Sequence, residues 1–435
     1  MIFWRKIIDF LFKRKDNVDD LSIYPNWRVG LSSAASWSWG VSLAVGMSIM
    51  YTKGFLPFLI WTAGNILAIP LFGIIRTYFP LSKHWPRFIV PMVVLFLFVE
   101  FFCIVLNLQG ILTGFGGNVK GIVSYPFLSP ETAKYAVMAI GLFVVWYIHK
   151  GGLKMSVLTD YGQYAVQLFG TILLATLGYF IGKHHDIAWV LTDPKTGLSG
   201  LEWAKFAFFG IIVGAMGTSH HWQRFHAIKE ENILKVSLWG GFWFGIYMFF
   251  VALTGLFFSS NIILGTIFVI VMIALGTSSI DSAVAGIEYN AVRLGFKQID
   301  LHYRTWISQK EKIYTIHPYK IATLMSIVAV LFWPYFASGS MADIWSFMAD
   351  QRLKIMGIFI VGTVVITCVR WLKNNTHNPF VITAMIAIII FLWQYFTVSI
   401  WSWPIALGLK TIITFIGATT LIALIKRPKN KSRKN

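Results

Sequence analysis

Long apolar runs, separated by short polar segments, divide the chain from about residue 29 to residue 425. A helix needs roughly 20 consecutive apolar residues to cross the hydrocarbon core of a bilayer, and most of these runs approach or exceed that length. The pattern therefore predicts about twelve membrane-spanning helices. They cover residues 29–51, 55–77, 87–112, 133–149, 156–182, 203–222, 234–259, 262–290, 319–337, 343–371, 380–398 and 401–425.

Composition agrees with a membrane protein and argues against other classes. Of the 435 residues, 57% are hydrophobic and 13% are charged, whereas a soluble domain carries about 25% charged residues. The net charge of +19 would suit nucleic acid if the basic residues were clustered, but they are dispersed between the apolar runs. We therefore expect a lipid bilayer as the partner of this chain, and no nucleic acid.

The placement of lysine and arginine predicts the orientation. When the spans alternate, the loops on the side of the N-terminus hold more basic residues than the opposite loops. By the positive-inside rule, both termini of this integral plasma- or inner-membrane protein are predicted to be cytoplasmic. Residues 1–27 mix apolar and basic residues without a long apolar core or a cleavage site, which predicts an amphipathic segment rather than a signal peptide.

Two predicted spans are rich in small and hydroxyl-bearing residues. They contain the segments Gly30 to Gly40 in the first span and Gly210 to His220 in the sixth. Small residues often mediate ordinary helix packing in membranes. The alternative is that these spans are interrupted helices, whose free backbone groups bind an ion or a solute. The two spans are five apart, a spacing that suits two five-helix repeats of opposite orientation.

The eighth span carries a polar stripe in its second half. Thr277, Ser278, Ser279, Asp281 and Ser282 fall within six residues. Helical spacing puts Ser278 and Ser282 on one face, with Asp281 close to it. Serines alone are explained by helix packing, but an aspartate inside the membrane is costly and is usually functional. Oxygen atoms without a basic residue among them suit a small, hard cation.

Two further polar segments precede this stripe. Residues 151–163 read Gly-Gly-Leu-Lys-Met-Ser-Val-Leu-Thr-Asp-Tyr-Gly-Gln, and residues 223–229 read Gln-Arg-Phe-His-Ala-Ile-Lys. Together with Ser278-Ser-Ile-Asp-Ser282, in this order and spacing, they resemble the motifs of the sodium/solute symporter family. The resemblance covers residues 28–295. In addition, Trp37-Ser-Trp-Gly-Val-Ser-Leu43 is similar to the first core helix of the urea-type members of that family.

The resemblance implies an all-α polytopic membrane protein with a leucine-transporter-like fold. This fold has two inverted repeats of five helices, which two C-terminal helices follow here. The expected segments are an N-terminal segment at 1–27, a first repeat at 28–182, a second repeat at 183–371, two additional helices at 372–426 and a basic cytoplasmic tail at 427–435.

The resemblance also implies a site, because the family binds a sodium ion between the first core helix and the eighth. Neutral oxygens hold Na⁺ weakly enough for release. The matching ligands are the carbonyls of Ala35, Ser38 and Leu275 and the hydroxyls of Ser278 and Ser279. The ion pathway would include Asp160 and Asp281, and the solute would bind near Trp37, Trp39 and Gly214.

These residues also have structural interpretations. Asp160 could pair with Lys154 or cap the fifth span. Arg224 and Lys229 are predicted to be topology anchors or partners of acidic loop residues. Trp37 could simply pack in the helix bundle.

The predicted function is a sodium-coupled symporter that imports a small polar solute by alternating access, with no enzymatic activity. The absence of a GxxxxGK[ST] loop argues against ATP-driven pumping. A proton-coupled or uncoupled transporter, or a sensor, stays open, because the extra N-terminal helix of most family members is not found here. A histidine-box membrane enzyme built on His220, His221 and His226 is disfavoured, since HExxH is absent and the other histidines are scattered.

Overall fold

The computed structural model describes a subset of the chain in which most predicted spans can be tested. The described residues are 20–38, 42–78, 105, 108–109, 128–192, 199–212, 215, 218–259, 261–293, 299–304, 311–316 and 318–336. The predictions for residues 1–19, for nearly all of span 87–112, and for everything after residue 336 therefore lie outside the described residues.

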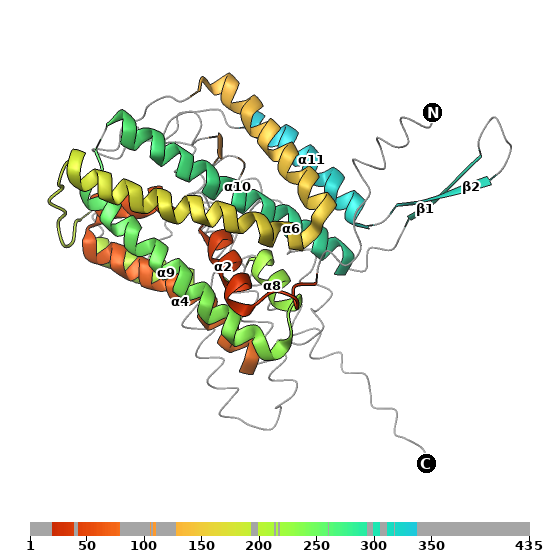
Figure 1. Cartoon of the computed structure of the whole chain (residues 1–435), viewed down its shortest axis with the longest axis horizontal. Helices are drawn as coiled ribbons and strands as arrows, with labels where there is room; N and C mark the ends of the chain where they lie inside the picture. Colours follow the sequence, from red (N-terminus) through yellow and green to blue (C-terminus); the bar gives the residue numbers. More distant parts are fainter. Residues whose placement is uncertain are drawn as a thin grey trace, which may run out of the picture. The chain divides into compact units, whose positions relative to one another are not determined.

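The described part is helical apart from one small hairpin (Figure 1). The helices are α2 (Asn26–Trp37), α3 (Ser42–Lys53), α4 (Phe55–Tyr78), α6 (Pro130–Ile181), α7 (Gly200–Ile212), α8 (Ser219–His226), α9 (Ile233–Phe257), α10 (Ile262–Arg293) and α11 (Pro318–Phe336). A 3-10 turn, η2 (Glu230–Asn232), precedes α9. The hairpin pairs β1 (Ile299–Arg304) with β2 (Glu311–Ile316), antiparallel, in what the sequence predicted to be a loop.

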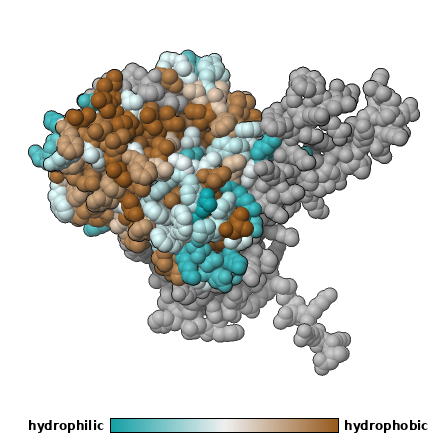
Figure 2. Space-filling model, in the orientation of Figure 1, coloured by the Kyte–Doolittle hydropathy of each residue, from teal (hydrophilic) through white to brown (hydrophobic). Residues whose placement is uncertain are grey.

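Four helices among the described residues are long and apolar enough to cross a membrane, by length and composition. They are residues Phe55–Ile74, Glu131–Ile181, Glu230–Phe257 and Ile262–Glu288. Large apolar side chains such as Phe143 and Phe249 are exposed on their outer faces, and Figure 2 shows apolar residues spread over the helices on this side. Such surfaces are unfavourable in water and suit contact with lipid.

Helix α6 contains both the fourth and the fifth predicted spans. Its 52 residues would extend for about 78 Å as one straight helix, far more than a bilayer core. The continuity is broken at Gly152, where φ is 53° and ψ is −148°, a conformation that side chains disfavour. In Figure 1 the gold first arm and the yellow second arm meet at a sharp bend. A bend at one glycine therefore replaces the predicted loop between the two spans.

The first and sixth predicted spans each contain two helices in the structure. In the first span, α2 ends at Trp37 and α3 begins at Ser42, and residues 39–41 lie outside the described residues. In the sixth span, α7 ends at Ile212 and α8 begins at Ser219, after Thr218 in an extended conformation (φ −108°, ψ 125°). The extended residue Thr218 confirms the predicted interruption of the sixth span, whereas the predicted interruption of the first span falls on residues 39–41, outside the described residues.

Helix α2 lies in the centre of the described part. Every residue from Val29 to Trp37 is buried, and the helix packs against α6, α9 and α10. Its contact with α9 depends on Gly30, because an added Cβ there would lie 2.5 Å from the Cβ of Trp239. The polar residues of α2 therefore face other helices rather than lipid.

Backbone hydrogen bonds tie the interrupted spans to each other at two places. The N–H of Leu191 donates to Lys53 O at the end of α3 (2.8 Å), and Leu191 O accepts from the N–H of Gly200 at the start of α7 (2.7 Å). Elsewhere, the N–H of Leu21, shortly before α2, donates to Ala227 O, directly after α8 (2.9 Å). Helix α3 is thereby joined to α7, and the α2 segment is joined to α8.

Candidate functional site

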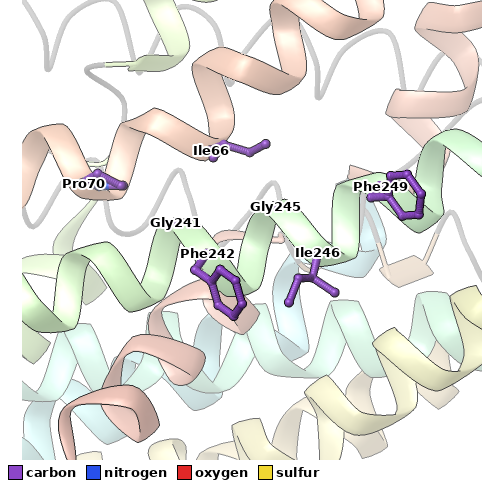
Figure 3. Close-up of a pocket in the computed structure, with 7 residues that line it drawn as sticks. All are labelled: Ile66, Pro70, Gly241, Phe242, Gly245, Ile246 and Phe249. Carbon is purple, nitrogen blue, oxygen red and sulfur yellow. The ribbon is translucent and has the colours of Figure 1, made fainter.

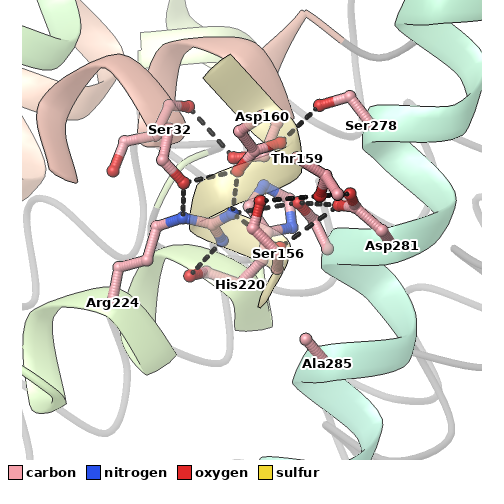
Figure 4. A network of polar contacts seen from close by, with 12 residues as sticks. Ser32, Ser156, Thr159, Asp160, His220, Arg224, Ser278, Asp281 and Ala285 are labelled. Atoms are coloured by element: carbon pink, nitrogen blue, oxygen red, sulfur yellow. Dashed lines mark hydrogen bonds and ion pairs between the residues drawn. The ribbon is translucent and has the colours of Figure 1, made fainter. Parts of the chain in front are cut away.

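A buried ion pair lies at the centre of the polar cluster in Figure 4. Arg224 Nη2 on α8 is 2.8 Å from Asp160 Oδ2 on α6, and both side chains are completely buried. A buried charge is tolerated only when it is paired and hydrogen-bonded. The two residues therefore neutralise each other inside the helix bundle.

The guanidinium of Arg224 connects four helices. Its five N–H groups form a planar fork that can donate in several directions at once. Besides Asp160, it donates to Ser32 Oγ on α2 (2.8 Å), His220 O on α8 (3.1 Å), Ser282 Oγ on α10 (3.0 Å) and Ser156 Oγ on α6 (3.4 Å). One side chain thus holds α2, α6, α8 and α10 together.

Asp160 connects the guanidinium of Arg224 to the hydroxyl groups of α10. Its carboxylate accepts hydrogen bonds from Ser32 Oγ and, at 2.7 Å, from Ser278 Oγ. Ser278 was predicted from the sequence as a sodium ligand. Asp160 and Ser278, which are 118 positions apart in the sequence, therefore lie in direct contact.

Asp281 forms a second buried carboxylate next to this pair. Tyr147 Oη and Thr159 Oγ1 donate to its Oδ2 at 2.9 and 2.8 Å. Ser156 Oγ and Ser282 Oγ donate to its Oδ1, each at 3.2 Å. Because Ser156 and Ser282 also accept from Arg224, the two aspartates belong to one hydrogen-bonded network (Figure 4).

The other predicted sodium ligands lie on the helices expected. Ser279 on α10 is buried and donates to Leu275 O (3.0 Å). Ser38, directly after α2, is buried and donates through its Oγ to Ala34 O (2.9 Å), and its N–H contacts Ala35 O (3.2 Å). Helices α2 and α10 pack against each other. The assignment of these residues as a ligand set stays a prediction.

Of the three predicted solute-binding positions, only Trp37 is described. Its ring is buried at the end of α2, and its centroid is 5.4 Å from that of His221 on α8. The rings of His220 and His221 are 4.4 Å apart. Trp39 and Gly214 lie outside the described residues.

Sequence reasoning misassigned Arg224. It was predicted to be a topology anchor or the partner of an acidic loop residue, but it is buried and paired with Asp160. Asp160, in turn, pairs with Arg224 and not with Lys154. A signal was present in the sequence: a carboxylate inside a span requires a cation, and Arg224 follows a span that is itself interrupted.

A second buried polar cluster was missed as well. Thr323 Oγ1 on α11 lies 2.8 Å from His149 Nδ1 on α6 and donates to Glu288 Oε1 on α10, also at 2.8 Å. His149 Nδ1 and Glu288 Oε1 are 3.7 Å apart. Nothing in the sequence order brings these three residues together.

An apolar groove lies apart from both polar clusters, and none of their residues lines it. It lies between α4 and α9, has a volume of about 490 Å³ and is lined by Ile66, Pro70, Gly241, Phe242, Gly245, Ile246 and Phe249 (Figure 3). This lining is apolar. Among the described residues, no group of three or more His, Cys, Asp or Glu side chains could hold a metal ion.

Solved structures resemble this chain, although no protein-family model and no curated protein matches its sequence. A Na⁺-coupled sialic acid symporter, in a substrate-bound outward-open state, has a TM-score of 0.53 and 16% identity, over 96% of this chain and 94% of that one. A histidine-to-alanine mutant of the Eremococcus coleocola manganese transporter has a TM-score of 0.52 and 13% identity, over 95% and 98%. A glutamate-to-glutamine mutant of that transporter gives 0.51 and 14%, over 97% and 94%.

At these identities the likeness shows the fold. The neighbours are membrane transporters and not enzymes. This chain has the helical fold of membrane transporters, and its long apolar helices make it an integral membrane protein. The twelve-helix count, the inverted repeat, the segment limits, the location of the termini and the likeness to urea-type members stay predictions.

Proposed function

We propose that the protein is a sodium-coupled symporter that imports a small polar solute by alternating access. The observation that carries this proposal is the contact of Ser278 on α10 with Asp160, whose carboxylate also accepts a hydrogen bond from Ser32 on α2. Na⁺ would bind between α2 and α10, with Ala35, Ser38, Leu275, Ser278 and Ser279 as its ligands.

The chemistry of these groups fits a sodium ion. The hydroxyl hydrogens of Ser278 and Ser279 are directed to Asp160 and to Leu275 O. A hydroxyl oxygen has two lone pairs in addition to its hydrogen, so both oxygens can still ligate a cation. Ala35 and Ser38 lie at the end of α2, where carbonyl groups carry partial negative charge. Hard cations prefer such oxygen ligands.

The hydrogen-bonded network connects the proposed ion site to the surrounding helices. A ligated Ser278 would remain bonded to Asp160, and Asp160 is held by the Arg224 hub that joins four helices. Na⁺ binding would therefore favour the conformer in which these helices are held together. A solute that binds the same conformer near Trp37, Trp39 and Gly214 would then bind more tightly, which is thermodynamic coupling.

The test is the stabilisation of purified protein by Na⁺ alone. A ligand that binds only the folded state stabilises it by about 2.7 kcal/mol at 100 times its Kd. We expect NaCl, but not choline chloride at equal ionic strength, to raise Tm. The double variant Ser278→Ala/Ser279→Ala should lose this rise and keep its Tm in choline chloride within a few degrees.

Thr277→Ala is the matched control. Thr277 lies on the same helix, is half-buried, and bonds only to its own helix, at Ile273 O and Ala274 O. It should keep the Na⁺ response. A full Na⁺ response in the double variant would disprove the site. No Na⁺ response in the wild type would favour the proton-coupled or uncoupled alternative.

A further inference from the structure

Among the described residues, two completely buried side chains each leave two polar atoms without a hydrogen-bond partner. They are His221, at both ring nitrogens, and Gln167, at both the amide oxygen and the amide nitrogen. Buried polar groups in native proteins are almost always paired, so each exception requires an explanation. An unpaired group inside a helix bundle is unfavourable unless a ligand or a water molecule pairs with it.

His221 lies near the beginning of α8 and faces the end of α2. It is the third residue of α8, which begins after the extended residue Thr218. Its ring faces Trp37 at the end of α2, with ring centroids 5.4 Å apart and planes inclined by 51°. The free nitrogens of His221 are therefore next to the end of α2.

Gln167 belongs to the inward face of the second arm of α6. Tyr164 and Thr171 lie three residues before it and four residues after it, on the same face. Tyr164 Oη donates to Trp243 O (2.6 Å), and Thr254 Oγ1 donates to Thr171 O (3.2 Å). Helices α6 and α9 therefore run side by side in the same direction, and Gln167 faces the interior of the bundle.

The same register places Gln167 at the level where α3 begins. Between Trp243 and Thr254 lies Tyr247, whose Oη accepts a hydrogen bond from Ser42 Oγ (3.1 Å). Ser42 is the first residue of α3. Gln167 and His221, on two different helices, are thus positioned near the start of α3 and the end of α2, respectively.

We propose that His221 and Gln167 bind the transported solute, and that this solute is uncharged and carries both hydrogen-bond donors and acceptors, as an amide or a polyol does. The proposal rests on the proposed transport function. A neutral imidazole offers one donor and one acceptor, and a carboxamide offers both kinds of group. The nearby charge of Arg224 is already neutralised by Asp160. The ring of Trp37 supplies an apolar wall for the solute.

The sign of a stability change distinguishes this role from a structural one. His221→Phe and Gln167→Leu keep much of the side-chain volume and remove the unpaired atoms. If these atoms are reserved for a solute, each variant should raise the Tm of solute-free protein by about 1–3 °C. If they have structural partners in the native protein, each variant should lower it, and the proposal is overturned.

Two residues with a paired side-chain nitrogen serve as controls, although Gln223 Oε1 is itself unpaired. His185 Nε2 lies 2.6 Å from Phe258 O, and Gln223 Nε2 donates to Ala285 O at 2.8 Å. His185→Phe and Gln223→Leu should therefore lower Tm. A decrease of the same size in His221→Phe and Gln167→Leu would give those residues a structural role.

The solute class is tested with four probes in NaCl: urea and myo-inositol, which are uncharged, the anion L-glutamate, and the cation tetraethylammonium. At least one uncharged probe should raise the wild-type Tm, and His221→Phe and Gln167→Leu should lose that rise. A rise with a charged probe only, or with no probe, would overturn the proposal. The response to Na⁺ alone is measured without solute, so failure of the proposed sodium coupling is recorded separately.

Discussion

Replacing Arg224 with leucine should be among the most destabilising single changes in the described part of this protein. The substitution leaves the carboxylate of Asp160 completely buried without its counter-ion. Breaking a buried ion pair by removing one partner costs about 3–5 kcal/mol, because the remaining charge stays in a medium of low dielectric. Four further hydrogen bonds of the guanidinium, to oxygens on α2, α6, α8 and α10, are lost as well.

The interaction itself is isolated by a double-mutant cycle with Asp160→Asn. Ser32 and Ser278 donate to different carboxylate oxygens. Asparagine therefore keeps a carbonyl acceptor for only one of the two hydroxyls, and it leaves the guanidinium of Arg224 without its buried counter-charge. Each single variant should therefore be strongly destabilised, and the double variant should cost much less than the sum. We expect a coupling energy of about 3 kcal/mol between the two positions.

Denaturant-unfolding midpoints in detergent measure this cycle, and an exposed ion pair provides the control. Lys134 Nζ and Glu131 Oε1 are also 2.8 Å apart, but Glu131 is 69% exposed. Exposed pairs contribute about 0–1 kcal/mol, because water solvates the separated charges. If the coupling of Arg224 with Asp160 were no larger than that of Lys134 with Glu131, the reasoning about burial would be refuted.

Two further substitutions test the elements around the site. Gly152→Ala should lower the free energy of unfolding by about 1–2 kcal/mol, because φ is 53° at the bend of α6. Gly162, on the same helix, faces open space, so Gly162→Ala should raise the free energy of unfolding by up to about 1 kcal/mol. A change of the same sign in both variants would contradict the assignment of the bend. Thr323→Val removes the hydroxyl that contacts both His149 and Glu288 and should cost about 1–3 kcal/mol in chemical denaturation, so an unchanged midpoint would show that the cluster stabilises nothing.

The span boundaries were largely predictable, because an apolar run and its polar borders are local properties of the sequence. Spans 234–259, 262–290 and 319–337 correspond to α9, α10 and α11, which begin at Ile233, Ile262 and Pro318. The sequence predicts a connection between the fourth and fifth spans at the correct position, but as a loop, whereas the structure has a bend at Gly152. A single glycine at positive φ is enough to reverse the chain, and spacing alone does not reveal this.

The site was only half predictable. Clustered hydroxyls and an intramembrane carboxylate singled out Ser278 and Asp281, because such groups are costly in hydrocarbon, and the family resemblance added Asp160; all three lie in the buried polar cluster. The partner of Asp160 could not be chosen in the same way, since a basic residue at the end of an apolar run has the pattern of a topology anchor. Only the packing of α8 against α2 and α10 shows that Arg224 points inward.

The two backbone links described above join the helices into two pairs, α3 with α7 and the α2 segment with α8. Leu191 fastens the far end of α3 to the beginning of α7, whereas Leu21 and Ala227 fasten the approach to α2 to the end of α8. In the proposed alternating-access cycle, rocking of the α3–α7 pair against the α2–α8 pair would open one end of the solute site while the opposite end stays closed.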